Sequence, residues 1–250
     1  MKPVARISTR GYYNLLNGKT IKNNSYYLYP KQDFKKLIDS KELTIMIHGL
    51  RNDSAGAIAK VILAKNKLKK LGYSYPVIGY SYDSNTIGAH LLKYAKRSLM
   101  AGQIIAQKNG RNLGKFIEDF KTINPKIKIR LIGHSLGSQV ILSTVEYLAK
   151  KKQNKGIIES VYFFGASITD DVPSSKKYGK LLDVIINKKI INHYAPTDDV
   201  LKWADDEKYV KGPLGLCGAI GNPIRKYHQK LTKPQNHRFA SYAKTLNSFP

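Results

Sequence analysis

One serine in this chain stands between two glycines at a spacing that can support nucleophilic catalysis. Residues 133–137 read Gly-His-Ser-Leu-Gly, the Gly-x-Ser-x-Gly pattern that exposes a serine hydroxyl when it lies on a sharp strand-to-helix turn. The spacing alone does not show that Ser135 is a nucleophile, because this serine could also be a simple helix N-cap. The flanks favour a nucleophile, because an apolar run at 127–132 precedes it and an apolar stripe with helical spacing follows at 136–148.

Two further motifs accompany the serine. Residues 48–53 read His-Gly-Leu-Arg-Asn-Asp after a short apolar run, and residues 79–84 read Gly-Tyr-Ser-Tyr-Asp-Ser. Together and in this order, the three motifs resemble the α/β-hydrolase superfamily over residues 48–237. They are most similar to a little-characterised, largely archaeal branch of it. The resemblance implies the fold and a serine-based hydrolase, but it does not indicate a substrate.

The resemblance also implies an oxyanion hole. In the superfamily, one backbone N–H comes from the residue after the His-Gly pair and the other from the residue after the serine. Here these are the amides of Leu50 and Leu136. Only backbone donors are needed where negative charge develops on the carbonyl oxygen, so leucine side chains are acceptable. The His48-Gly49 pair could alternatively be a turn that ends a strand.

A serine nucleophile needs a base, and the chain order of this fold is Ser, then Asp or Glu, then His. His237 lies in an expected loop before the last helix, where the fold keeps its base, and is the first choice. His228 lies in the basic run 224–230, expected as an exposed helix or loop, and is the alternative. His193 falls inside an expected strand and is predicted to belong to the core.

The base needs a carboxylate that fixes its tautomer. Asp198 follows an expected strand and precedes Val200 by two residues, as superfamily members often show, so it is the first choice. Asp199 is a close alternative, because the register of a short loop is not determined by sequence. Asp170 and Asp171, after an earlier strand, come third, and the unused aspartates are expected as turn or cap residues.

The elements that must position these residues alternate along the chain. Strands are expected at 43–47, 75–82, 127–132, 161–165 and 190–194, and helices at 54–71, 136–148, 178–186 and 239–246. A further amphipathic helix is expected around 113–120, whereas 83–112 reads as polar and weakly helical. Alternation predicts an α/β fold, a mostly parallel central sheet flanked by helices. Ligands of such sheets bind beyond the carboxyl ends of the strands, where every candidate above falls.

The whole chain, 1–250, is predicted to form a single α/β-hydrolase domain. Its N-terminal segment, 1–42, reads as extended pieces and an edge hairpin. The stretch 202–236 alternates apolar residues with glycines and is interpreted either as a flap over the site or as a tightly packed glycine loop. Cys217, within it, lacks the surroundings of a nucleophile.

The net charge of the chain indicates which kinds of partner it could bind. The net charge is +26, from 43 Lys+Arg against 17 Asp+Glu, and such a surface attracts polyanions. However, the lysines are spread over the whole length and accompany no recognisable nucleic-acid module. We therefore expect a solvated surface with at most weak binding to anionic surfaces.

Other classes are excluded or not indicated. A single cysteine excludes an internal disulfide, and no spacing of His or Cys predicts a metal site or a cofactor motif. The start of the chain lacks a signal-peptide core, and no segment is long enough to span a membrane, so a cytoplasmic protein is expected.

The sequence thus predicts a metal-independent, cofactor-free serine hydrolase that cleaves a carboxylester, lipid ester, lactone or thioester through a Ser-His-Asp triad and an acyl-enzyme. The alternative is a non-catalytic or weakly catalytic protein of the same fold that binds anionic membrane or nucleic acid.

Overall fold

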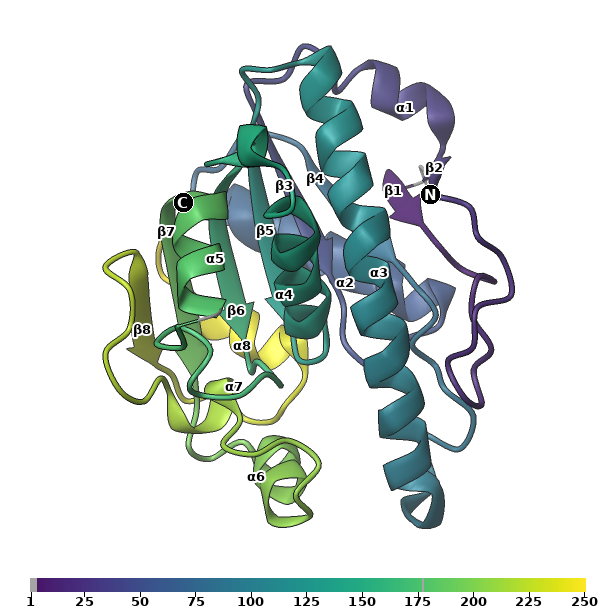
Figure 1. Ribbon diagram of the computed structural model, residues 1–250, viewed down its shortest axis with the longest axis vertical. Helices are drawn as coiled ribbons and strands as arrows, with labels where there is room; N and C mark the ends of the chain where they lie inside the picture. Colours follow the sequence, from purple (N-terminus) through teal and green to yellow (C-terminus); the bar gives the residue numbers. More distant parts are fainter. Residues whose placement is uncertain (1–3, 177) are drawn as a thin grey trace.

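The computed structural model describes residues 4–176 and 178–250, and its centre is an eight-stranded sheet with helices on both faces (Figure 1). The strand order is β2-β1-β4-β3-β5-β6-β7-β8, and all neighbours pair in parallel except β1 and β2. The strands are β1 (Arg6–Ser8), β2 (Tyr27–Tyr29), β3 (Glu42–Ile47), β4 (Val77–Ser81), β5 (Lys128–His134), β6 (Ile158–Phe164), β7 (Ile186–Tyr194) and β8 (Tyr227–Leu231). The predicted fold class, a mostly parallel sheet flanked by helices, is confirmed.

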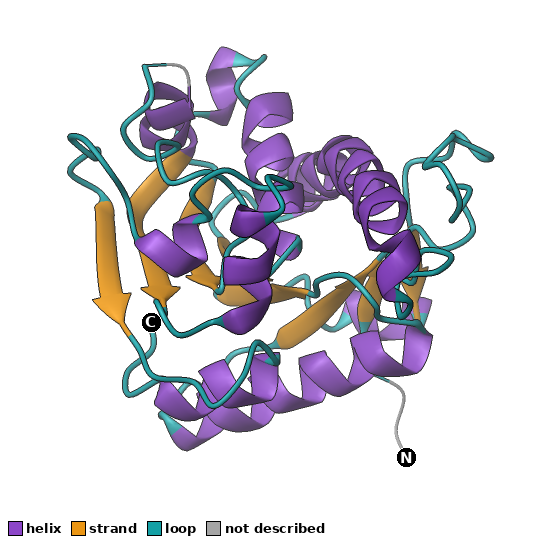
Figure 2. Cartoon of the chain, turned by 90° about the horizontal axis from the view of Figure 1, so that it is seen from below, coloured by secondary structure: helices purple, strands orange, loops and turns teal. Residues whose placement is uncertain are grey.

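Helices cover the sheet in two layers (Figure 2). One face packs against α3, α4 and α5, and the other packs against α2 and α8. Alternate residues of a strand supply the two cores: Ile45 and Ile47 of β3 lie in the first, and Met46 lies in the second. The helices are α1 (Lys31–Lys35), α2 (Ser54–Lys70), α3 (Ala95–Ile123), α4 (Gly137–Leu148), α5 (Tyr178–Ile185), α6 (Asp199–Asp206), α7 (Leu214–Cys217) and α8 (Phe239–Thr245), with short 3₁₀ turns at Leu92–Tyr94 and Lys152–Asn154.

Helix α3 is much longer than the sequence predicts. It runs without interruption for 29 residues, so the reading of 95–112 as weakly helical is wrong. Its buried face there consists mainly of small and polar residues. A Cβ added to Gly110 would lie 2.4 Å from Ser143 of α4, and one added to Gly114 would lie 2.3 Å from the Tyr147 ring. Glycines let the two helices approach closely, and this packing outweighs a weak apolar pattern.

The N-terminal segment contains the expected edge hairpin, β1 with β2, and a single carboxylate fixes the loop between them to the sheet. Asp83, just after β4, accepts the backbone N–H groups of Gly11, Tyr12 and Tyr13 at 3.0, 3.0 and 3.1 Å. The aspartate of the 79–84 motif therefore serves to anchor backbone.

Two histidines show how the sheet places side chains. His228, expected on a helix or loop, lies exposed on the edge strand β8 instead, because its run pairs in parallel with β7. His193 of β7 is buried as predicted, stacked on Phe164 with ring centroids 4.5 Å apart. Both its ring nitrogens are buried without a hydrogen-bond partner among the described residues.

Burial of His193 predicts acid sensitivity. Burial lowers the pKa of His193 to about 4 from an ordinary 6.5, so between these values the unfolded chain takes up a proton that the folded chain excludes, and stability falls as pH falls. His193→Phe keeps the stacking and removes this proton. The slope of unfolding free energy against pH should decrease by up to about 1.4 kcal/mol per unit. Denaturant titrations between neutral and mildly acidic pH measure the slope. Exposed His228→Gln is the control, and equal slopes in wild type and His193→Phe would contradict the prediction.

Candidate active site

Ser135 lies at a sharp turn between β5 and α4. Its φ is +52°, a left-handed conformation that a residue with a side chain rarely adopts and that is typical of functional sites. The flanking glycines permit the turn. A Cβ on Gly133 would lie 2.7 Å from Ile141, and one on Gly137 would lie 2.5 Å from the Ile47 carbonyl oxygen. The turn therefore holds the Ser135 hydroxyl at the carboxyl edge of the sheet.

Ser135, His237 and Asp198 form one line of hydrogen bonds. The distance from Ser135 Oγ to His237 Nε2 is 2.8 Å, and that from His237 Nδ1 to an Asp198 carboxylate oxygen is 2.7 Å. Because a carboxylate can only accept, Nδ1–H donates to Asp198 and Nε2 is left to accept the serine proton. The first-choice residues of the sequence are thus the ones that the structure brings together.

Asp198 is held as an anion. It caps α6 by accepting the Leu201 N–H at 3.1 Å, and the Tyr242 hydroxyl donates to it at 2.6 Å. Burial alone would raise the pKa of Asp198, but the hydrogen bonds from His237, Tyr242 and Leu201 hold that pKa below its usual range. A charged carboxylate at this position can stabilise an imidazolium at His237.

The alternative residues lie elsewhere. Asp199 is exposed on the first turn of α6, and His228 is exposed on β8. Asp170 and Asp171 belong to a loop that pairs with residues 212–220, and neither lines the pocket beside Ser135. The pKa of Asp170 is raised by burial and by the neighbouring Asp171.

His134, one residue before the serine, was not predicted from the sequence to be a site residue. Its Nε2–H donates to the backbone carbonyl of His237 at 2.7 Å. Burial and the neighbouring His237 lower the pKa of His134 to about 3, so it is neutral and keeps this proton. His134 therefore fixes the loop that carries the base. Its signal in the sequence is only a polar residue at the end of a buried strand.

Two backbone N–H groups beside the serine are free. Those of Leu50 and Leu136 donate to no atom of the described residues, and both leucines line the pocket with Ser135. Asn52 Nδ2 donates to the Gly49 carbonyl at 3.0 Å, and the Ser138 hydroxyl donates to the Ser135 carbonyl at 2.6 Å. The C=O and N–H of a trans peptide point in opposite directions. Holding these two carbonyls therefore turns the N–H groups of Leu50 and Leu136 the other way.

His48 connects the motif at residues 48–53 with the motif at residues 79–84. Its Nδ1–H donates to the Gly49 carbonyl at 3.0 Å, and its Nε2 accepts the Tyr82 N–H at 3.3 Å. The His48 and Tyr82 rings stack with centroids 4.5 Å apart, and the Tyr82 hydroxyl donates to the His48 carbonyl at 3.0 Å. Burial, followed by the charge of Arg10, lowers the pKa of His48 to about 3. This neutral histidine supports the Gly49–Leu50 peptide. The His48-Gly49 pair therefore does more than end a strand.

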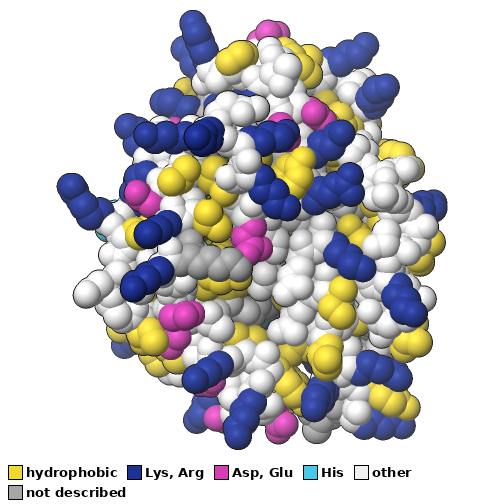
Figure 3. Space-filling model, viewed as in Figure 1, with side chains coloured by type: hydrophobic (Ala, Val, Ile, Leu, Met, Phe, Trp, Pro, Cys, Tyr) yellow, Lys and Arg dark blue, Asp and Glu magenta, His cyan; other side chains and the backbone are white. Residues whose placement is uncertain are grey.

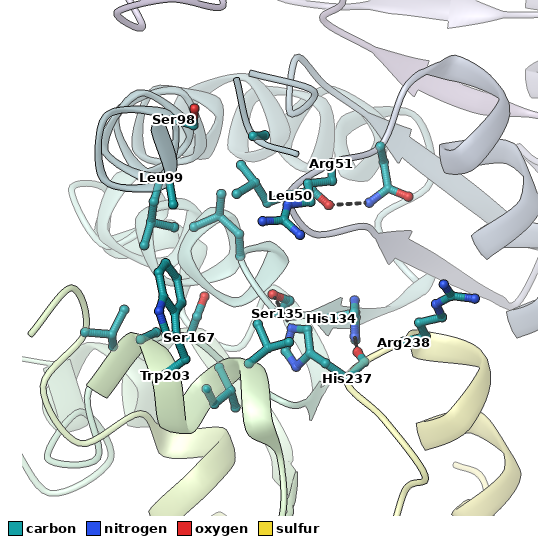
Figure 4. A pocket seen from close by; sticks show the side chains of 18 of the residues that line it. Leu50, Arg51, Ser98, Leu99, His134, Ser135, Ser167, Trp203, His237 and Arg238 are labelled. Atoms are coloured by element: carbon teal, nitrogen blue, oxygen red, sulfur yellow. Dashed lines mark hydrogen bonds between the residues drawn. The ribbon is translucent and has the colours of Figure 1, made fainter. Parts of the chain in front are cut away.

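A pocket of about 600 Å³ opens over Ser135. Figure 4 shows Leu99 and Trp203 on one side of the serine and His134 and Arg238 on the other. The apolar wall comes mostly from α3, α6 and the segment after α6, and consists of Ala89, Ala95, Leu99, Val200, Leu201, Trp203, Ala204 and Val210.

The glycine-rich stretch 212–221 contributes no residue to the lining. A Cβ on Gly215 would lie 2.1 Å from the Ala166 nitrogen, so this part is packed against the sheet edge. Cys217 is exposed and also outside the lining. Within residues 4–176 and 178–250, no group of three His, Cys, Asp or Glu side chains could hold a metal ion, and no helix there is long and apolar enough to cross a membrane.

The parallel sheet, the sharp serine turn after β5 and the order of Ser135, Asp198 and His237 in the chain define an α/β-hydrolase fold. In sequence, residues 98–205 match the family described as "Protein of unknown function (DUF726)". The chain is also 37% identical over 97 residues to an uncharacterized membrane protein, F35D11.3, of Caenorhabditis elegans. This alignment covers 39% of the chain and 15% of the worm protein.

Solved structures similar to this chain share little sequence with it. A lipase-esterase related protein from Clostridium acetobutylicum is 12% identical, with a TM-score of 0.38 over 80% of this chain and 88% of that one. A cutinase-like protein from Cryptococcus sp. is 13% identical, with a TM-score of 0.36 over 76% and 75%. Phospholipase PlaB from Legionella pneumophila is 10% identical, with a TM-score of 0.34 over 76% and 37%.

Proposed function

We propose that the protein is a serine hydrolase that cleaves an ester-like bond (carboxylester, lipid ester, lactone or thioester). The observation that carries this proposal is the hydrogen-bonded line from Ser135 through His237 to Asp198, beside two backbone N–H groups that have no partner among the described residues. Nucleophile, base, orienting carboxylate and oxyanion donors are the parts that acyl transfer needs.

The proposed reaction has two halves. Ser135 Oγ attacks the carbonyl carbon while its proton passes to His237 Nε2, and the oxyanion accepts the Leu50 and Leu136 N–H groups. The bond to the leaving alcohol then breaks, and His237 returns the proton to the alcohol oxygen. Water, deprotonated by the same histidine, attacks the acyl-enzyme and releases the acid.

A fluorophosphonate probe tests the proposal directly. We expect one covalent adduct per chain in the wild type, mapped to Ser135 by mass spectrometry, because the probe reacts with an activated serine. The heat-denatured chain is the control. An unlabelled native chain, or a label on another serine, would refute the proposal.

Asn52 should support the reaction by holding the backbone of the proposed oxyanion hole. Asn52→Asp removes the amide that holds the Gly49 and Leu50 carbonyls and puts a negative charge in its place. We expect kcat for a nitrophenyl ester to fall about 10- to 100-fold with little change in KM, because complete loss of one oxyanion donor costs about 10²–10³-fold. Asn66→Asp, exposed on α2, is the matched control. If KM rises and kcat is unaltered, Asn52 has another role.

The second candidate, a non-catalytic binder of anionic membrane or nucleic acid, has less support. Figure 3 shows Lys and Arg side chains scattered over the face in view. A surface that docks on a polyanion would instead have them clustered. We propose that most of this charge serves solubility and that binding to anionic vesicles is weak even at low salt. A chain that binds such vesicles tightly and remains unlabelled by fluorophosphonate would favour the binder. The archaeal branch and the cytoplasmic location stay predictions from the sequence.

A further inference from the structure

The pocket over Ser135 is lined by positively charged side chains. Three cationic side chains line it, Arg51, Lys60 and Arg238, and no carboxylate in the described part of the chain does. The carboxylate next to the pocket, Asp198, has a fully buried side chain behind His237 and is occupied by three hydrogen bonds. Among the described residues that line the pocket, no carboxylate therefore neutralises these three positive charges.

None of these three cations has a side-chain partner in the described part of the chain. Over residues 4–176 and 178–250, Lys60, Arg51 and Arg238 form no ion pair, side-chain hydrogen bond or ring contact. Lys60, on α2, is the informative one because it is half-buried. An ammonium group that has lost part of its hydration without gaining a partner is costly. Burial and the nearby Arg238 both lower the pKa of Lys60. A bound anion would offset the cost of keeping this ammonium group charged.

The positions of the cations fit the direction of the reaction. Arg238 directly follows His237, the group that protonates the leaving alcohol, and Arg51 directly follows Leu50 of the proposed oxyanion hole. Figure 4 shows Leu99 and Trp203 of the apolar wall on one side of Ser135 and Arg238 on the other. An acyl chain on the apolar side places the alcohol part of the ester toward Arg238.

Building on the proposed hydrolase activity, we propose that the substrate is an acyl ester whose alcohol carries a phosphate group, and that Lys60, with Arg51 and Arg238, binds this phosphate. Three unpaired cations suit a phosphate, with up to two charges and several acceptor oxygens, better than a single carboxylate. Cleavage breaks the acyl C–O bond and forms the Ser135 ester. The alcohol leaves with the His237 proton and its phosphate intact, and water then yields the free acid.

Matched ester pairs test this inference. The wild type is compared on monobutanoyl glycerol phosphate and monobutanoyl glycerol, and on the corresponding dodecanoyl pair, all below the concentration at which they aggregate. We expect kcat/KM to favour the phosphate ester by about 10-fold or more in at least one pair, and salt should reduce the preference. The pair with the higher kcat/KM identifies the source of the phosphate, a water-soluble ester or a lipid headgroup.

Variants assign the effect to the pocket. Lys60→Met keeps the length of the side chain and should lower the phosphate-to-neutral ratio of kcat/KM by about 10-fold, since one charge-assisted contact is lost. Lys65→Met removes an exposed lysine of the same helix and should leave the ratio unaltered. Equal rates on phosphate and neutral esters, or an equal loss of ratio in both variants, would overturn the phosphate site while leaving the hydrolase intact. Failure on every ester, with no fluorophosphonate label on Ser135, would overturn both proposals.

Discussion

Ser135→Ala should lower kcat for nitrophenyl butyrate by about 10⁴- to 10⁶-fold, to the rate that binding and oxyanion donors alone sustain. The hydroxyl is the only atom group removed, and its partner His237 remains bound to Asp198. The residual rate is measured with protein purified separately from any wild-type stock, because trace contamination would hide a loss of this size.

The same measurement on His237→Ala checks that the two residues act as a unit. Each single variant should lose about as much as the double variant, because a nucleophile without its base and a base without its nucleophile are equally ineffective. Thermal unfolding of all three proteins verifies that the fold is retained. A rate within about tenfold of wild type in Ser135→Ala would exclude the mechanism.

Asp198→Asn should lower kcat by about 10⁴-fold, the size of effect known when the orienting carboxylate of a serine triad becomes an amide. The neutral amide no longer stabilises the imidazolium, and its NH₂ group can donate to Nδ1 and favour the wrong tautomer of His237. The Tyr242 hydroxyl and the Leu201 N–H would also lose a charged acceptor.

The adjacent residue offers a matched control. Asp199→Asn changes an exposed carboxylate on the same helix turn, so its kcat should stay within about twofold of wild type, as is usual for surface substitutions. Proton NMR can follow the His237 Nδ1 proton, which should be seen downfield in the wild type and be lost or shifted in Asp198→Asn only. A large loss of kcat in Asp199→Asn with full activity in Asp198→Asn would show that the register of this loop is wrong.

Local patterns in the sequence were sufficient for the frame of the molecule. Strands β3 and β6 are buried along their whole length and consist mostly of hydrophobic residues, so they are visible without knowledge of their neighbours. Strand β5 is buried except at Lys128, and its apolar residues alternate with Lys128 and Arg130. The turn at Ser135 was equally visible, because its steric demand falls on glycines two residues away. Such signals depend on residues close together in the chain, and the alternation of strands with helices adds that the strands are parallel.

The tertiary structure decided what depends on contacts between distant segments. The sequence ranked His237 before His228 and Asp198 before Asp199. The contacts of His237 with Ser135 and with Asp198, across 102 and 39 positions of the chain, depend on the folded arrangement. The length of α3 was hidden because its buried face there consists mainly of small and polar residues, with Gly110 and Gly114 packed against α4, and the sequence shows no large apolar stripe. The hydrogen bonds of Asn52 to the Gly49 and Leu50 carbonyls, and the lack of a partner for Lys60 in the described part of the chain, are not visible in the sequence. Whether a polar group finds a partner is a property of the folded arrangement and not of the residue itself.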